Sequence, residues 1–306
     1  MEHKRILPVI AAILLLSCII LTTIFLLLNH RINYLPESSV DSLVEIMAKE
    51  NIIISREVIP TKIENSTVYL CASENYQETI AGLLSGSSTD AVYVIPGGQI
   101  ILMKDGSVFR FGDNFSFEYH RDGERGEVPN LLDGTYFSGH LNETKYNEIA
   151  SVATQFLDKG SRGFKSDEKM SVLTKADRIS EKDGKYYVFC TRSIDGMEIT
   201  ENTVLCTVEN GKVTEAFGSW SFLTLGEAYS AQLSDILNIL FNVKKEISAT
   251  KEKDQAVTVT AIEKCYALYF FGETDEFCLI PCCKIVTDSM GEYIYNRIDG
   301  TLYTKT

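Results

Sequence analysis

Histidine is scarce in this chain, which contains only 4 in 306 residues. Three of them, His30, His120 and His140, lie beyond residue 28, and we expect His120 and His140 to be solvated loop residues. The spacings HExxH, GxSxG and GxGxxG are absent, as are a Walker loop and an EF-hand loop. The sequence therefore argues against zinc proteases, serine hydrolases and nucleotide-binding enzymes of these types.

Basic residues are also few in this chain compared with acidic ones. The chain has 29 Lys and Arg against 42 Asp and Glu, which gives a net charge of −13. Binding to a phosphate backbone requires clustered Lys and Arg that displace counterions, so nucleic acid is excluded as a partner. At 306 residues the chain is longer than one hydrophobic core usually serves, and two packed domains are expected.

The cysteines have no disulfide-framework spacing, since seven of the eight are scattered beyond residue 28. Cys282 and Cys283 are adjacent, and neighbours in a strand point to opposite faces, so the two sulfurs should not share a metal ion. A turn near residues 273–274 would place Cys265 opposite Cys282 or Cys283. A disulfide there and buried free thiols remain alternatives, the latter favoured.

Other candidate chemistry is weak. Ser166 and Ser248 each precede a lysine by three residues, at Lys169 and Lys251, but the Lys-Thr-Gly element of penicillin-recognising enzymes is missing. A cluster of acidic residues could hold Ca²⁺, although a solvated surface is the favoured interpretation. The cluster comprises Asp113, Glu118, Asp122, Glu124 and Glu127. We predict no catalytic, cofactor or metal site, and no enzymatic activity.

The dominant feature is an apolar, uncharged run over residues 6–28. As a helix it would span roughly 34 Å, enough to cross the ~30 Å core of a bilayer. Lys4 and Arg5 precede it, and only Arg31 follows closely, which predicts a cytoplasmic stub over residues 1–5 and an extracytoplasmic body. A cleaved signal peptide and a lipidated Cys18 are less favoured alternatives. The prediction is a single-pass cell-membrane protein.

This run also offers a candidate partner-contact face. Ala11, Leu15, Cys18 and Thr22 recur at helical spacing, and Cys18 and Thr22 are small residues four apart. Small residues at this spacing allow two helix backbones to approach closely. The alternative is a simple anchor whose small residues are incidental.

Periodicity predicts an α+β body in which long helices pack on antiparallel β-meanders. Strands are predicted between the helices, with Asp-Gly and Asn-Gly turns. A boundary in the polar stretch around residue 139 predicts a first domain over 29–139 and a second over 140–306. The predicted helices cover about residues 36–50, 76–84, 142–159 and 224–247.

Several short apolar and proline-containing motifs follow the apolar run. After the apolar run come Leu-Pro-Glu at 35–37, Ile-Ile-Ile at 52–54 and Ile-Pro at 59–60. The C-terminal part adds Leu-Ile-Pro at 279–281 and Tyr-Ile-Tyr-Asn at 293–296, followed by Asp-Gly at 299–300. On these residues the chain resembles the YycI/YycH proteins of Gram-positive bacteria. It departs from their pattern at Cys283, where the family often has an aromatic residue.

The resemblance implies a non-enzymatic, membrane-anchored regulator of the cell-wall sensor histidine kinase WalK (YycG). The implied contacts with the kinase are made by the membrane helix and by the extracytoplasmic domains, without a cofactor. A second YycH/YycI-like anchor protein and the lipid bilayer are further expected partners. An extracytoplasmic binding module for a wall fragment, peptide or cation is the alternative function.

Overall fold

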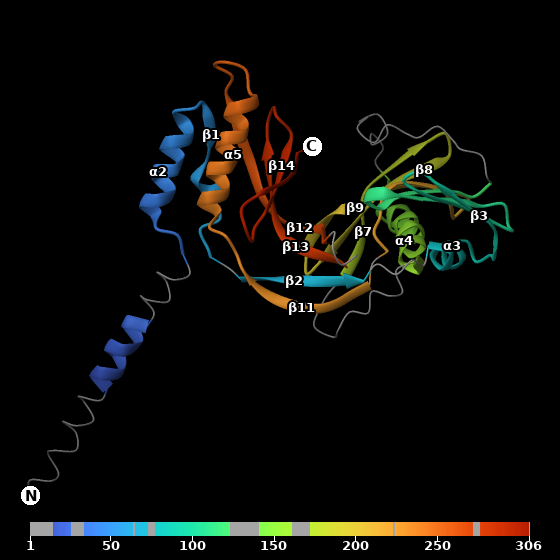
Figure 1. The fold of residues 1–306 in the computed structure, drawn as a ribbon, viewed down its shortest axis with the longest axis horizontal. Helices are drawn as coiled ribbons and strands as arrows, with labels where there is room; N and C mark the ends of the chain where they lie inside the picture. Colours follow the sequence, from blue (N-terminus) through green and yellow to red (C-terminus); the bar gives the residue numbers. More distant parts are fainter. Residues whose placement is uncertain are drawn as a thin grey trace, which may run out of the picture. The chain divides into compact units, whose positions relative to one another are not determined.

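The computed structural model describes residues 15–25, 34–63, 65–72, 77–122, 141–160, 172–222, 224–271 and 276–305. Over these residues strands account for 50% and helices for 29% (Figure 1). The prediction of long helices packed on antiparallel meanders is therefore wrong, because the fold is mostly β-sheet. Strand β12 pairs in parallel with both β1 and β9.

The helices are short. Besides a helical segment at residues 15–25, they are α2 (Glu37–Ala48), α3 (Gln77–Ser85), α4 (Glu143–Gly160) and α5 (Ile236–Thr250), with 3₁₀ turns η1 (Arg56–Val58) and η2 (Asp113–Phe115). The strands are β1 (Ile52–Ile54), β2 (Asn65–Ala72), β3 (Thr89–Ile95), β4 (Gly98–Met103), β5 (Val108–Gly112), β6 (Ser116–His120), β7 (Val172–Lys182), β8 (Lys185–Ile194), β9 (Met197–Glu209), β10 (Lys212–Ser219), β11 (Thr224–Gln232), β12 (Val257–Phe271), β13 (Glu276–Thr287), β14 (Glu292–Asn296) and β15 (Leu302–Lys305).

The clearest error concerns the helix predicted over residues 224–247. Residues Thr224–Gln232 form strand β11, which pairs with β2. The helix begins only at Ile236, where the side chain of Asp235 accepts a hydrogen bond from the Leu237 N–H at 3.0 Å. Pairing with a neighbouring strand outweighed the helical pattern predicted from residue 224 onward, because local propensity yields to tertiary hydrogen bonding.

The predicted transmembrane helix over 6–28 also needs correction. Its described part is the helix at residues 15–25, and the other residues of the run lie outside the described ranges. Among the described residues, no helix is long and apolar enough to cross a membrane. The prediction of a single-pass membrane protein is therefore not supported.

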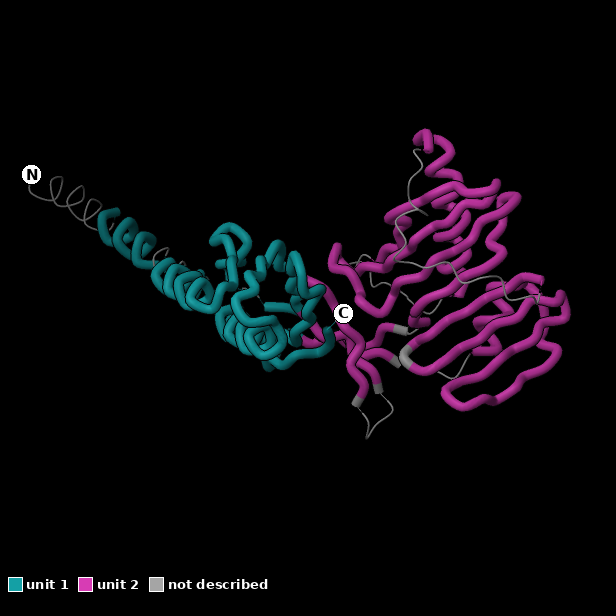
Figure 2. The backbone as a smooth tube through the Cα atoms, turned by 90° about the horizontal axis from the view of Figure 1, so that it is seen from above, with its two compact units in different colours: residues 1–66, 230–263, 283–306 teal, residues 67–229, 264–282 magenta. Residues whose placement is uncertain are grey.

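The chain folds into two compact units, each built from separated segments (Figure 2). Unit 1 comprises residues 1–66, 230–263 and 283–306, and unit 2 comprises residues 67–229 and 264–282. Each unit thus combines residues from both predicted domains. The predicted boundary at 139–140 lies outside the described residues.

Unit 1 packs helices α2 and α5 on a small mixed sheet. The strand order is β1-β12-β13-β14-β15, with Ile52 of β1 paired in parallel with Val257 of β12. Apolar residues recur at helical spacing in both helices, and this spacing places them on one side of each helix. The core joins Val40, Leu43 and Met47 of α2 and Ile236, Ile239, Leu240, Val243 and Ile247 of α5 to Ile52, Ile54, Val257, Val259, Cys283, Ile285, Tyr293 and Tyr295 of the sheet.

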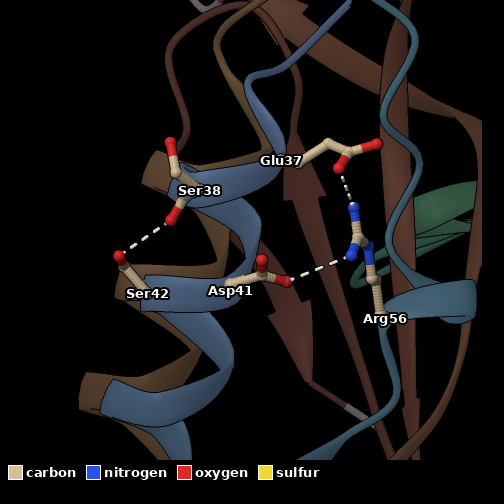
Figure 3. Close-up of polar contacts among 5 residues, drawn as sticks. All are labelled: Glu37, Ser38, Asp41, Ser42 and Arg56. Atoms are coloured by element: carbon tan, nitrogen blue, oxygen red, sulfur yellow. Dashed lines mark hydrogen bonds and ion pairs between the residues drawn. The ribbon is translucent and has the colours of Figure 1, made fainter.

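Ion pairs add little to this packing. Arg56 of η1 reaches both Glu37, at 3.3 Å, and Asp41, at 3.4 Å, on α2 (Figure 3). The three side chains are largely exposed, and exposed pairs usually contribute at most about 1 kcal/mol. Burial of the apolar face of α2 therefore holds this helix in place.

Unit 2 contains the longest run of antiparallel pairing. Strands β3 to β6 form a meander that continues through β10, β9, β8 and β7, and β3 is its last strand on one side. Helices α3 and α4 pack on one face of this sheet and close its main core. That core contains buried rings from Phe109, Phe111, Phe117, Tyr119 and Trp220.

Candidate functional site

The predicted partner-contact face lies partly on the helix at residues 15–25, drawn in dark blue in Figure 1. Leu15, Cys18 and Thr22 share one side of it, and the Thr22 hydroxyl donates a hydrogen bond to the Cys18 carbonyl at 2.8 Å. Ala11 lies outside the described residues. The contact role of this face stays a prediction.

The helix at residues 15–25 exposes apolar side chains on all of its sides. Every side chain from residue 15 to 25 is exposed, including Leu15 and Phe25 at 66% each. An apolar helix in a globular protein normally buries at least one face. The described residues supply no such cover, so this segment is a strong candidate for contact with another molecule.

Of the residues weighed for catalysis, the structure describes His120 and the Ser248/Lys251 pair. His120 is 6% exposed, not solvated as predicted, and its ring packs edge-on against Phe217 at 4.9 Å. The reason is its position in β6 between β5 and β10, opposite Val108 and Glu215. His140 and the Ser166/Lys169 pair lie outside the described residues.

The other serine–lysine pair also lacks catalytic geometry. Ser248 is exposed near the end of α5, while the ammonium group of Lys251 donates to the carbonyls of Glu50 and, at 3.1 Å, Gln255. An ammonium group held by two carbonyl oxygens is not poised to accept a proton from a serine hydroxyl.

The acidic candidates are only partly described. Glu118 of β6 lies directly opposite Arg110 of β5, with 4.0 Å between their charged groups. Asp113 and Asp122 are exposed, and Glu124 and Glu127 lie outside the described residues. Within the described ranges, no group of His, Cys, Asp and Glu side chains is arranged to hold a metal ion.

All eight cysteines are free thiols, so Cys265 pairs with neither Cys282 nor Cys283. Cys282 and Cys283 are both buried, and Cys283 belongs to the core of unit 1. Burial raises the pKa of the Cys283 thiol, and also that of Cys71, to about 12. In unit 2 a hydrogen bond with Cys190, together with burial, raises the pKa of Cys206.

We expect that Cys18 alone reacts rapidly with N-ethylmaleimide in the folded protein, because it is exposed. At pH 7.5, a thiol of pKa about 12 has roughly 3,000-fold less thiolate than one of pKa about 8.5. Mass spectrometry after brief labelling checks this expectation, with all eight thiols reacting in urea as the control. Modification of Cys71 or Cys283 before Cys18 would contradict it.

Sequence reasoning missed an aromatic patch in unit 2, which we define as Phe115, Phe270 and Phe277. The Phe277 ring lies 5.1 Å from Phe115 and 4.9 Å from Phe270. Phe270 is 48% exposed, whereas Phe115 and Phe277 pack on the smaller core around Tyr266. The patch is suited to hold apolar groups of a partner.

The backbone of Phe115 is unusual. Its φ angle is 61°, a left-handed conformation that is rare for a bulky residue. Its carbonyl accepts a hydrogen bond from the backbone N–H of Trp220 at 2.8 Å, and its ring contacts Phe277. These two contacts hold the ring in the patch. The aromatic run at 269–271 was a sequence signal for the patch, but nothing local linked it to Phe115.

Comparisons with known proteins give little further guidance. No model of a known protein family matches the chain, and no curated protein matches it. A solved structure that resembles it is an uncharacterized protein from Eubacterium rectale, with 12% sequence identity and a TM-score of 0.47. The similarity covers 88% of this chain and 99% of that chain. It carries no argument about function.

Proposed function

We propose that this protein is a non-enzymatic regulator that binds a sensor histidine kinase of the WalK type. One observation carries the proposal: the helix at residues 15–25 is apolar and exposed on every side. An apolar helix in a globular protein normally buries at least one face, so a helix exposed on every side requires a covering surface. A helix of a partner protein provides such a surface, and the resemblance to the YycI/YycH proteins supports a kinase as that partner.

The face formed by Leu15, Cys18 and Thr22 fits close helix packing. Thr22 satisfies its own hydroxyl through the Cys18 carbonyl, so the small side chain can face an apolar surface without an unpaired donor. A bulky side chain at Cys18 or Thr22 would hold the two helix backbones apart.

The test is a kinase-dependent transcriptional reporter in cells that contain the full chain. We expect Cys18→Leu and Thr22→Leu to change kinase output by about fivefold, which corresponds to about 1 kcal/mol of contact energy. Ser17→Leu is the matched control, since Ser17 lies about 100° of helical rotation from Cys18 and should have almost no effect. Equal behaviour of the three variants would remove this face from the proposal.

Direct contact is measured with a photo-crosslinking residue. Placed at residue 18 or 22 it should capture the kinase, and placed at residue 17 it should not. Absence of a kinase adduct at both residue 18 and residue 22 would overturn the proposed function.

The aromatic patch favours a second candidate function, namely binding of a peptide or a wall fragment. Phe270 is 48% exposed beside Phe277, and aromatic surfaces of this kind hold apolar or sugar groups. Capture of a peptide or glycan from residue 270, with no kinase adduct from residue 18 or 22, would favour this function over kinase control.

A further inference from the structure

Strand β3 presents an open sheet edge. It is the last strand of the meander in unit 2, and among the described residues only β4 pairs with it. Its side chains are exposed on both faces: Val92 at 37%, Tyr93 at 54% and Val94 at 86%. Val92 and Val94 point to one face of the sheet and Tyr93 to the other.

From Ala91 to Ile95 this edge lacks the usual protection against pairing. Exposed edges are commonly blocked by lysine, by proline within the strand, or by charges that point inward. From Ala91 to Ile95 the strand is Ala-Val-Tyr-Val-Ile, with neither charge nor proline. Asp90 at a bulge and Pro96 in the turn mark the two ends of this apolar stretch. An unblocked apolar edge predicts that another strand covers it.

The turn geometry fixes which backbone groups face outward. Ile95 pairs with Gly98 across a two-residue loop, in which Gly97 has φ 76°. The pair that flanks such a loop is hydrogen-bonded, and hydrogen-bonded pairs alternate along the ladder. Tyr93 therefore directs its N–H and C=O toward β4. Val92 and Val94 direct theirs outward.

The outward groups are symmetric about Tyr93. If a second β3 runs antiparallel and is centred there, Val92 lies opposite Val94 of the second copy, and Ala91 lies opposite Ile95. The two Val92–Val94 pairs exchange about four backbone hydrogen bonds, while the Tyr93 side chains meet across a non-hydrogen-bonded pair. The two Asp90 residues end up roughly 20 Å apart, beyond the Debye length of about 8 Å, so charge does not oppose this register.

We propose that two copies of this chain associate through β3 in an antiparallel, two-fold symmetric pair that extends the unit 2 sheet. A two-fold interface requires a self-complementary surface, and the sequence around Tyr93 supplies one. Because the contact is a short strand with three exposed side chains per copy, the dimer is weak, with a dissociation constant on the order of micromolar. This inference does not depend on the proposed kinase partner.

Sedimentation of the full chain over a concentration series tests the association. We expect a monomer–dimer equilibrium that Val94→Lys shifts at least tenfold toward monomer. The control is Leu302→Lys on β15 of unit 1, another exposed apolar position (38%), which should leave the equilibrium unchanged. A monomer at every concentration would overturn the proposal, and so would a dimer unaffected by Val94→Lys.

Crosslinking tests the register. In a Cys18→Ser background, the Tyr93→Cys variant should form a disulfide between the two copies when diamide is added. Diamide is the oxidant, and it accepts the two electrons and two protons that the two thiols lose. The Cα atoms of a directly opposed pair lie about 4.5 Å apart, which a disulfide can bridge. Val94→Cys places its two copies about 8 Å apart diagonally, too far for a disulfide. Equal crosslinking at both positions would overturn this pairing.

Discussion

Replacing Phe109 with alanine should lower the free energy of unfolding by about 3–5 kcal/mol. The Phe109 side chain is fully buried on β5, and its ring centroid lies 4.8 Å from that of Tyr119 and 6.3 Å from that of Phe111. The substitution removes buried apolar surface and leaves a cavity, because the sheet and helix α4 relax only partly. Such a loss is a large part of the 5–15 kcal/mol that stabilises a typical domain.

Urea unfolding followed by fluorescence measures this loss. Trp220 is the only tryptophan of the chain and lies in the same core, so its emission reports on unit 2. Phe109→Leu is the conservative control and should cost roughly 1–2 kcal/mol, since it retains most of the volume. A loss below about 1 kcal/mol for the alanine variant would show that this core is not closely packed.

Raising the pH above about 9 should destabilise the protein steeply. Burial raises the pKa values of Cys71 and Cys283 to about 12 in the folded chain, whereas an unfolded cysteine has a pKa of about 8.5. Because the folded pKa is the higher one, the neutral thiols contribute their full stability below about pH 8.5. This contribution is lost as the pH rises toward 12. Each thiol should reduce the unfolding free energy by about 1.4 kcal/mol per pH unit in that window.

Urea unfolding at several pH values between 8 and 11, in the presence of a reductant, gives the slope. Cys71→Ala and Cys283→Ala should each reduce the slope of unfolding free energy against pH by the contribution of one proton, about 1.4 kcal/mol per pH unit. Each substitution also lowers stability at pH 8 through the lost packing. Cys18→Ala is the control, because this thiol is exposed and its removal should leave the slope unchanged. An unchanged slope in both buried-thiol variants would refute the linkage.

Local chemistry made several elements predictable from the sequence. The predicted turns at Asp183-Gly184, Asp195-Gly196 and Asn210-Gly211 all occur, with positive φ angles at both residues of each pair. Helices α2, α3 and α4 lie where apolar periodicity predicted them, within one or two residues at most ends. These features depend on neighbours in the chain, so a short window of sequence contains the information they need.

The candidate site was less predictable, because its parts come together only in the folded chain. The placement of Cys18 and Thr22 on one side of a helix follows from their spacing alone, and the Thr22 hydroxyl donates to the Cys18 carbonyl, while the contact role of this face stays a prediction. The aromatic patch joins Phe115 to Phe270 and Phe277, more than 150 residues away in the sequence, so no local pattern could indicate it.

The sequence by itself determined the acidic charge, the turns, three helices and the apolar N-terminal run. Tertiary structure alone decided that Thr224–Gln232 is a strand, that His120 is buried, and that β3 ends the meander with Val94 exposed. The physical reason is that strand pairing and burial depend on which distant segment lies alongside. An apolar strand has the same sequence pattern at the centre of a sheet as at its edge. Only the presence or absence of the next strand decides whether its side chains form a core or an interaction surface.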